Sequence, residues 1–440
     1  MRKEAIVEII RESQQRPLPG MVDRTLEVRI PRSGRAVTII GPRRAGKTYF
    51  LYQQIRRLRE EGTTDGVLYV NLEDDRLLNV QLEDMDMFLR TFREINPESA
   101  SAKTYLFLDE VQVVEGWERY VRRVMDKEDV QVFLTGSSSR LLAKEVATMM
   151  RGRSLTYTML PFGFGEFLEA RGVAFADHLS PRDRSRMLAY LREFMTYGGF
   201  PEVVLEEAED SKLRILRELV DVMLMRDVIE RHGLRNIMAL RTLLSRLISS
   251  MGTEFSINKL AGSLRSQGIK VSKNTLYDYF GHLEDVFAIL PVRRFSYKLR
   301  EIQQSLPKVY PVDTGLVTQS EGRFSDDLGR FMEGVVAIEL HRRRAADPLM
   351  EIYYWKDDHG KEVDFVIKEG KRVTRLIQVC YDLEALDTRD REVKALLKSS
   401  KDLGCKDLTI ITWDSEEEAL VDGRTIEAIP LWKWLTGRKR

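Results

Sequence analysis

Residues 41–48 read Gly-Pro-Arg-Arg-Ala-Gly-Lys-Thr and match the pattern G-x-x-x-x-G-K-[ST]. In this pattern the glycines let backbone N–H groups converge on phosphate oxygens, the lysine reaches the β- and γ-phosphates, and the threonine hydroxyl binds Mg²⁺. An apolar run at 36–40 precedes the turn, and a helical pattern with Leu51, Ile55 and Leu58 on one face follows it. We therefore expect a loop that binds ATP and Mg²⁺. Its expected nucleotide contacts are Gly41, Pro42, Arg43, Arg44, Ala45, Gly46, Lys47, Thr48 and Tyr49.

Two carboxylates at the end of the apolar run 104–108 predict the hydrolytic half of the same site. There Asp109 would hold Mg²⁺ together with Thr48, and Glu110 would polarise the attacking water. The alternative for such an acidic pair, if it stood alone, is a solvated turn after a strand. Because a phosphate-binding pattern precedes it, we favour ATP hydrolysis.

A third apolar run, 131–134, ends in small hydroxyl residues. We expect Ser137 to contact the γ-phosphate or the water, with Thr135 as the second candidate; an ordinary turn is the alternative for each. Further along, Arg153 or Arg151 could act as an arginine finger in a neighbouring subunit's site or sense nucleotide in its own. The alternative is that both are surface arginines.

These polar residues follow strands that alternate with helices. Such alternation predicts an α/β fold with a parallel sheet and helices on both faces. Ligands of these sheets bind at the carboxyl ends of the strands, where the lysine and the acids are expected to meet.

Length and charge set the limits for the rest of the chain. At about 150 residues per domain, 440 residues correspond to roughly three domains. The net charge is +1, from 70 basic and 69 acidic residues, so any basic surface that binds nucleic acid must be local. Two cysteines exclude a disulfide scaffold and favour a reducing compartment. The N-terminus lacks a signal-peptide core and the chain lacks a long apolar run, so we expect a cytoplasmic protein without a membrane span.

The order of the segments GPRRAGKT, YLFLDE, LTGSSS and RGR to LPFGFGEF resembles the AAA+ superfamily. More narrowly, it is similar to archaeal and bacterial AAA ATPases that carry a C-terminal domain of nuclease-like fold, and the resemblance continues through Tyr-Gly-Gly-Phe-Pro-Glu at 197–202. It implies an AAA+ ATPase core at 1–164, a helical lid at 165–235 and a homo-oligomer.

Residues 236–312 are expected to form a winged-helix domain. Ser256 and Ser272 are good helix N-caps, and the second helix should be followed by a strand pair at about 287–297 and 307–311. In a winged helix, the second helix lies in the DNA major groove and the hairpin reaches phosphates. The alternative is a structural or protein-docking module, and the acidic Asp278 on the same helix argues against a groove fit. The candidate DNA contacts are Lys273, Asn274, Tyr277, Arg293, Arg294 and Lys298.

Residues 313–440 resemble the restriction-endonuclease-like fold, whose metal site needs an Asp on one strand and Glu-x-Lys on the next. Asp364 fits the first place, but the second reads Gln378-Val379-Cys380. Glutamine is a poor Mg²⁺ ligand and cysteine cannot supply the charge of lysine, so we do not expect this domain to cleave DNA. A helix before the strands carries Glu333 and Glu339.

Three interpretations of function follow. The preferred one is an oligomeric ATP-driven motor that acts on DNA, with branched or structured DNA suggested by analogy alone. The second is a nuclease gated by ATP, against which the degenerate site argues. The third is a nucleotide-dependent switch that docks a protein partner.

Overall fold

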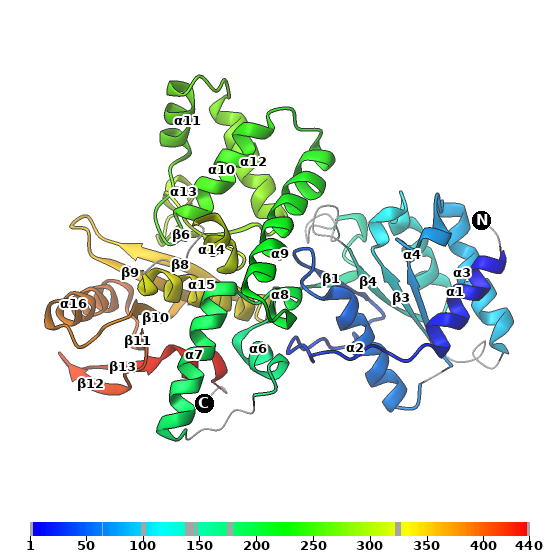
Figure 1. Ribbon diagram of the computed structural model, residues 1–440, viewed down its shortest axis with the longest axis horizontal. Coiled ribbons are helices and arrows are strands. Elements are labelled where there is room, and N and C mark those ends of the chain that lie inside the picture. The colour runs from blue at the N-terminus through cyan, green and yellow to red at the C-terminus, as the bar shows by residue number, and fades with distance from the viewer. Residues whose placement is uncertain are drawn as a thin grey trace. The chain divides into compact units, whose positions relative to one another are not determined.

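The computed structural model describes residues 3–63, 65–97, 103–136, 146, 148–173, 179–321 and 327–437, and the chain divides into two compact units, Met1–Met159 and Leu160–Arg440 (Figure 1). The segment expected as the core, 1–164, comprises the first unit and the first five residues of the second. The segments expected as lid, winged helix and nuclease-like domain all lie in the second.

The first unit is built on a five-stranded parallel sheet of order β2-β3-β4-β1-β5. Its strands are short and apolar, and every residue of β1 and β4 is buried, as expected for a sheet covered on both faces. The elements are α1 (Lys3–Gln15), β1 (Ala36–Ile40), α2 (Lys47–Glu60), β2 (Val67–Asn71), α3 (Met85–Ile95), β3 (Thr104–Asp109), α4 (Trp117–Lys127), β4 (Val130–Thr135) and β5 (Ser154–Thr158).

Helix α2 packs on this sheet through the face that the sequence predicts. Leu51, Ile55 and Leu58 are buried in one cluster with Phe107 and Phe133, whose rings stack at 4.5 Å between centroids. Burial of large apolar side chains contributes roughly 1.5–3 kcal/mol each, so this cluster holds the start of α2 firmly beside the strand ends.

The second unit begins with helices and continues into a mixed sheet. In Figure 1, α10, α11 and α12 group together, apart from the strands β8–β10 of the same unit. Its helices are α6 (Phe164–Ala170), α7 (Pro181–Tyr197), α8 (Pro201–Leu205), α9 (Glu209–Val222), the π-helix Met223–Glu230, α10 (Ile237–Ser249), α11 (Ile257–Ser266), α12 (Lys273–Asp285), α13 (Leu299–Gln304), α14 (Gly315–Glu321), α15 (Leu328–Ala346), α16 (Leu386–Leu403) and α17 (Leu431–Thr436).

Eight strands form this sheet, in the order β12-β13-β11-β10-β9-β8-β6-β7. Strands β8, β9 and β10 form an antiparallel meander, and β11 lies parallel to β10 after the crossover through α16. The strands are β6 (Ile289–Arg294), β7 (Lys308–Pro311), β8 (Met350–Lys356), β9 (Glu362–Glu369), β10 (Arg372–Cys380), β11 (Leu408–Thr412), β12 (Glu417–Val421) and β13 (Arg424–Pro430).

The expected boundary at 312/313 falls inside this sheet. Strand β6 pairs with β7 on one side and, in parallel, with β8 on the other. The expected strand pair is present, because β6 and β7 are antiparallel neighbours. Strand β6 is in addition an interior strand, so this hairpin is continuous with the C-terminal sheet.

The Tyr-Gly-Gly-Phe-Pro-Glu segment packs closely against Asp313. The buried Asp313 carboxylate accepts hydrogen bonds from the backbone N–H groups of Gly199, at 2.7 Å, and Gly315, at 2.9 Å. A Cβ atom on Gly198, whose φ is +78°, would lie 1.6 Å from Asp313 Oδ1. Burial raises the pKa of Asp313 to about 6, although the two N–H groups act in the opposite direction. This contact joins the end of α7 to the segment before α14.

Candidate nucleotide site

The phosphate-binding pattern forms a tight loop between β1 and α2 in which two glycines are required by geometry. At Gly41 φ is +150°, and an added Cβ atom would lie 2.0 Å from the carbonyl oxygen of Met159. Gly46 is the N-cap of α2 with φ +92°, a left-handed conformation that glycine adopts without a steric penalty. The loop therefore leads directly into the N-terminus of α2, where the backbone N–H groups of a helix favour an anion.

Lys47 is buried and holds the loop together. Its Nζ donates hydrogen bonds to the carbonyl oxygens of Gly41, at 3.1 Å, and Pro42, at 3.0 Å. The ammonium thus lies inside the concave side of the loop, where phosphate oxygens would replace the two carbonyls as partners.

Asp109 lies at the carboxyl end of β3 and collects three hydroxyl groups. Thr48 Oγ1 donates to Oδ2 at 2.7 Å, Tyr69 OH donates to the same oxygen at 3.0 Å, and Thr135 Oγ1 donates to Oδ1. The carboxylate is 1% exposed. Burial raises its pKa, and the hydrogen bonds from Thr135, Thr48 and Tyr69 partly offset that effect. A hydroxyl and a carboxylate oxygen in contact are a suitable pair of ligands for Mg²⁺, so the residues fit this ion.

Glu110 follows directly in a strained conformation. Its φ of +54° is left-handed, which is rare for a residue with a long side chain. The backbone N–H donates to Thr135 Oγ1 at 3.1 Å, and Gln112 Nε2 donates to Glu110 Oε2. Strained backbone of this kind concentrates at functional sites, and here it lies between β3 and the short 3-10 helix Val111–Val113.

The remaining expected site residues are Ser137 and Arg153. Ser137 lies outside the described residues, and Thr135, the second candidate of that segment, is the hydroxyl that contacts Asp109. Arg153 precedes β5, at the amino-terminal edge of the sheet, and pairs with Asp126. It therefore does not reach the phosphate loop of its own unit.

Sequence reasoning missed two residues of the site. Tyr69 comes from β2, the strand beside β3, and its neighbour Tyr52 OH donates to its hydroxyl at 3.3 Å. Arg24 is buried and donates from Nη1 to the carbonyl oxygen of Ala45 at 2.5 Å, so it supports the phosphate loop from behind. The sequence could have indicated Tyr69, because it is a polar group near the end of an expected strand. Arg24 lies in a segment without a recognisable sequence pattern.

Comparison with known proteins places this chain in a family. Residues 33–168 match the family described as AAA domain, residues 188–327 a domain of unknown function (DUF8612) and residues 328–434 a domain of unknown function (DUF4143). Over 421 residues, 94% of this chain and 91% of the relative, the sequence is 38% identical to the uncharacterized protein MJ1544 of Methanocaldococcus jannaschii. The chain belongs to the family of this archaeal protein.

The first unit of this family member is an AAA+ domain, with the parallel sheet and phosphate loop of P-loop ATPases. Among solved structures, the Walker-type ATPase PABY2304 of Pyrococcus abyssi is similar with a TM-score of 0.42, at 12% identity over 73% of this chain and 95% of that one. The Aeropyrum pernix ORC1 protein in complex with DNA has a TM-score of 0.30, at 14% identity over 74% and 91%. In the described part of the chain, no helix combines the length and apolar character that a membrane crossing requires.

Of the six candidate DNA contacts, three share a surface of the second unit. Helix α12 exposes Lys273, Asn274 and Tyr277 to solvent, and Tyr277 is 52% exposed. The expected cap Ser272 accepts a hydrogen bond from the backbone N–H of Thr275 at 3.0 Å, so the helix begins where predicted.

The other three candidates lie elsewhere. Arg293 and Arg294 stand on the interior strand β6, opposite Tyr353 and Tyr354 of β8, and both are half-buried. Lys298 is exposed and forms an ion pair with Glu301 at 2.9 Å. The antiparallel pair β6–β7 therefore carries or encloses all three residues, as expected, and their contact with DNA stays a prediction.

Proposed function

We propose that this protein hydrolyses ATP at the site formed by Lys47, Thr48, Asp109 and Glu110. The observation that carries the proposal is the contact of the Thr48 hydroxyl with the buried Asp109 carboxylate, with Glu110 as the next residue. It is supported by the match of this segment to AAA domains.

Each residue then has a defined task. Lys47 exchanges its two carbonyl partners for phosphate oxygens, which neutralises charge on the nucleotide. Thr48 and Asp109 would hold Mg²⁺, which supplies charge stabilisation to the transferred phosphoryl group. Glu110 orients the attacking water, and Thr135 keeps Asp109 and the Glu110 backbone in place through its single hydroxyl.

We further propose that the protein acts on DNA as a homo-oligomer, with Lys273, Asn274 and Tyr277 on α12 as the contact surface. Their exposure supports this, because a lysine, an amide and an aromatic ring on one helix suit phosphate, base-edge and stacking contacts. Arg153 is proposed to complete a neighbouring subunit's site, since it does not reach its own.

The test is steady-state ATP hydrolysis without DNA and with single strands, duplex and a four-way junction, beside Glu110→Gln. We expect one of these DNA structures to stimulate turnover and the variant to bind ATP without turning it over. Turnover that is intact but indifferent to all three DNA structures would refute the DNA proposal and favour a switch that docks a protein. Absence of turnover in the wild type would refute the ATPase proposal itself.

A further inference from the structure

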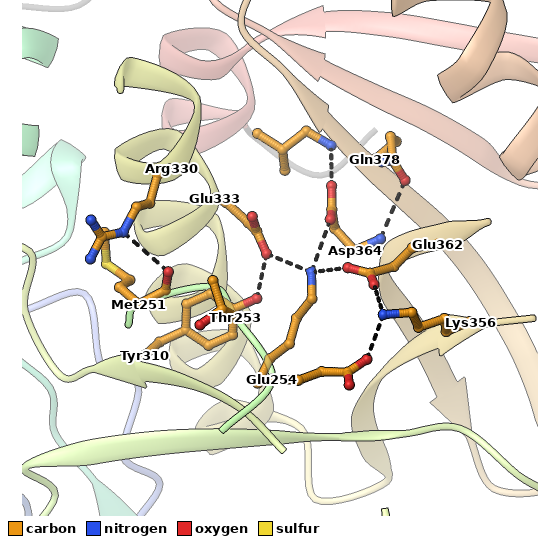
Figure 2. Close-up of polar contacts among 12 residues, drawn as sticks. Met251, Thr253, Glu254, Tyr310, Arg330, Glu333, Lys356, Glu362, Asp364 and Gln378 are labelled. Atoms are coloured by element: carbon orange, nitrogen blue, oxygen red, sulfur yellow. Dashed lines mark hydrogen bonds and ion pairs between the residues drawn. The ribbon is translucent and has the colours of Figure 1, made fainter. Parts of the chain in front are cut away.

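A buried lysine outside the Asp and Glu-x-Lys pattern occupies the centre of the acidic cluster on the C-terminal sheet. Lys308 comes from β7, and its side chain is 4% exposed. Its Nζ lies 2.9 Å from Glu333 Oε1, 2.6 Å from Glu362 Oε1 and 3.2 Å from Asp364 Oδ1. Figure 2 shows these three carboxylates converging from α15 and β9. One ammonium therefore satisfies acidic groups from two elements.

Asp364, the aspartate of the expected metal site, has both oxygens engaged by the protein. Oδ1 contacts Lys308, and Oδ2 accepts a hydrogen bond from the backbone N–H of Val379 at 2.9 Å. Gln378 accepts from the Asp364 N–H at 3.3 Å and donates to Glu392 at 2.6 Å, so its amide is also committed to protein partners.

The spacing of the cluster suits an ammonium ion and not Mg²⁺. Ligand oxygens surround Mg²⁺ at about 2.0–2.1 Å and Ca²⁺ at about 2.3–2.6 Å, whereas the oxygens here lie at hydrogen-bond distances from nitrogen. Among the described residues, no group of three or more His, Cys, Asp and Glu side chains is arranged to hold a metal ion. The divalent metal that a nuclease-like fold implies does not fit these residues.

The electrostatics are consistent with a permanent cation. Burial disfavours the Lys308 ammonium, but the negative charges of Asp364, Glu333 and Glu362 outweigh this effect and raise the pKa of Lys308 well above its usual value. Burial, with Asp364, raises the pKa of Glu333 to about 7, and Tyr310 OH donates to Glu333 Oε1 at 2.6 Å. Removing the ammonium would leave acidic groups buried without compensation, which is costly.

We infer that Lys308 is the built-in cation of this site: its ammonium takes the position of a divalent metal, so the C-terminal sheet carries a metal-free site that does not cleave nucleic acid. Cys380, which stands where the Glu-x-Lys pattern has its lysine, does not restore a positive charge. Its Sγ donates to the carbonyl oxygen of Asp382 at 3.2 Å, and burial raises its pKa to about 11.

The cluster also connects the segment before α11 to the sheet. Glu362 is shared with Lys356 on β8, at 3.2 Å, and Lys356 pairs with Glu254 at 2.7 Å. Glu254 stands two residues before Ser256, the N-cap of α11. A continuous chain of ion pairs therefore runs from Glu254 to Asp364. It joins the segment before α11 to the sheet at the position where a nuclease would bind metal.

The first experiment uses the nucleotide-free wild type and Asp364→Asn, titrated with Mn²⁺ and followed by electron paramagnetic resonance. We expect both proteins to bind the same number of Mn²⁺ ions, because any weak binding at the phosphate loop is common to both. An ion that the wild type binds and Asp364→Asn does not would overturn the inference. This comparison does not require a variant of Lys308 to fold.

The second experiment is chemical rescue of Lys308→Ala, since propylammonium replaces the atoms that this substitution removes. We expect propylammonium to raise the Tm of the variant by about 2–4 °C over equal tetramethylammonium, which has the charge but no N–H donors. Lys371→Ala, at an exposed lysine outside this cluster, is the control and should show no such difference. Rescue of Lys308→Ala by Mn²⁺ in preference to propylammonium, or a folded variant that responds to neither, contradicts an ammonium site.

Discussion

Thr48 Oγ1 donates a hydrogen bond of 2.7 Å to Asp109 Oδ2. The contact joins the last residue of the phosphate-binding pattern to the last residue of β3. It brings the hydroxyl and the carboxylate together in advance of any metal, so little rearrangement of these two side chains is needed when Mg²⁺ binds with ATP.

Replacement of Lys47 by alanine is expected to weaken ATP binding by about tenfold or more, because hydrogen bonds to charged groups contribute about 1.5–3 kcal/mol each. Binding of a fluorescent ATP analogue measures the effect. Lys127→Ala, an exposed lysine in the last turn of α4, is the matched control and should bind as the wild type does. Equal affinity for both variants would show that the phosphates bind elsewhere.

Loss of the Glu110 carboxylate should separate binding from turnover. We expect Glu110→Gln to retain ATP affinity while kcat falls by about 10²-fold or more, since positioned acid–base groups contribute about 10²–10⁴-fold. Single-turnover hydrolysis of labelled ATP measures this. If kcat is unchanged, another residue positions the water.

The Tyr69 hydroxyl is expected to influence the pH below which ATP hydrolysis is lost. Burial raises the Asp109 pKa and the Tyr69 hydrogen bond lowers it, so Tyr69→Phe should raise this pKa further. Because protonated Asp109 cannot hold Mg²⁺, activity falls as pH decreases through this pKa. The acid limb of kcat/KM should therefore move to higher pH by about one unit.

Tyr105→Phe on the neighbouring strand β3 is the control for this shift, and its acid limb should coincide with that of the wild type. An unchanged or lower acid limb in Tyr69→Phe would mean that Asp109 does not govern the profile.

Gly198→Ala should be strongly destabilising. Its Cβ atom would lie 1.6 Å from Asp313 Oδ1, and φ there is +78°. Overpacking, together with a backbone conformation (φ +78°, ψ −162°) that is nearly confined to glycine, predicts a loss of about 3 kcal/mol or more in the free energy of unfolding. Gly172→Ala has a similar φ of +66° with nothing within 4 Å, so only about 1–2 kcal/mol is expected there. Urea unfolding measures both, and equal losses would show that contact with Asp313 is unimportant.

The proposed DNA surface on α12 makes a prediction about salt. Lys273→Ala should weaken binding of the DNA that stimulates turnover and reduce the salt-dependence slope by about one, as the loss of one phosphate contact predicts. Lys371→Ala, an exposed lysine in the turn between β9 and β10, is the control. A lower affinity with the same slope would mean that Lys273 does not contact phosphate.

The parts of the fold that the sequence predicted are those with local causes. The G-x-x-x-x-G-K-T pattern occupies consecutive residues, and the N-caps Ser256 and Ser272 act on the backbone three residues ahead. Interactions between residues so close in sequence depend on the local sequence and little on the rest of the fold.

The pairing that the sequence did not predict has a different cause. Strand β6 pairs with β7 as expected, but its second partner, β8, lies about sixty residues further along the chain. The partner of a strand outside its hairpin depends on which apolar faces can be buried together. The apolar pattern along one strand does not identify that partner.

The sequence alone determined that an apolar strand, a glycine-rich loop and a helix would present Lys47 and Thr48 to phosphates, because each step follows from neighbouring residues. Only the tertiary structure decided that Tyr69 would complete the surroundings of Asp109 and that Lys308 would neutralise Asp364, 56 positions away. A buried charge must find its partner wherever the packed elements bring one, and that position is a property of the whole core.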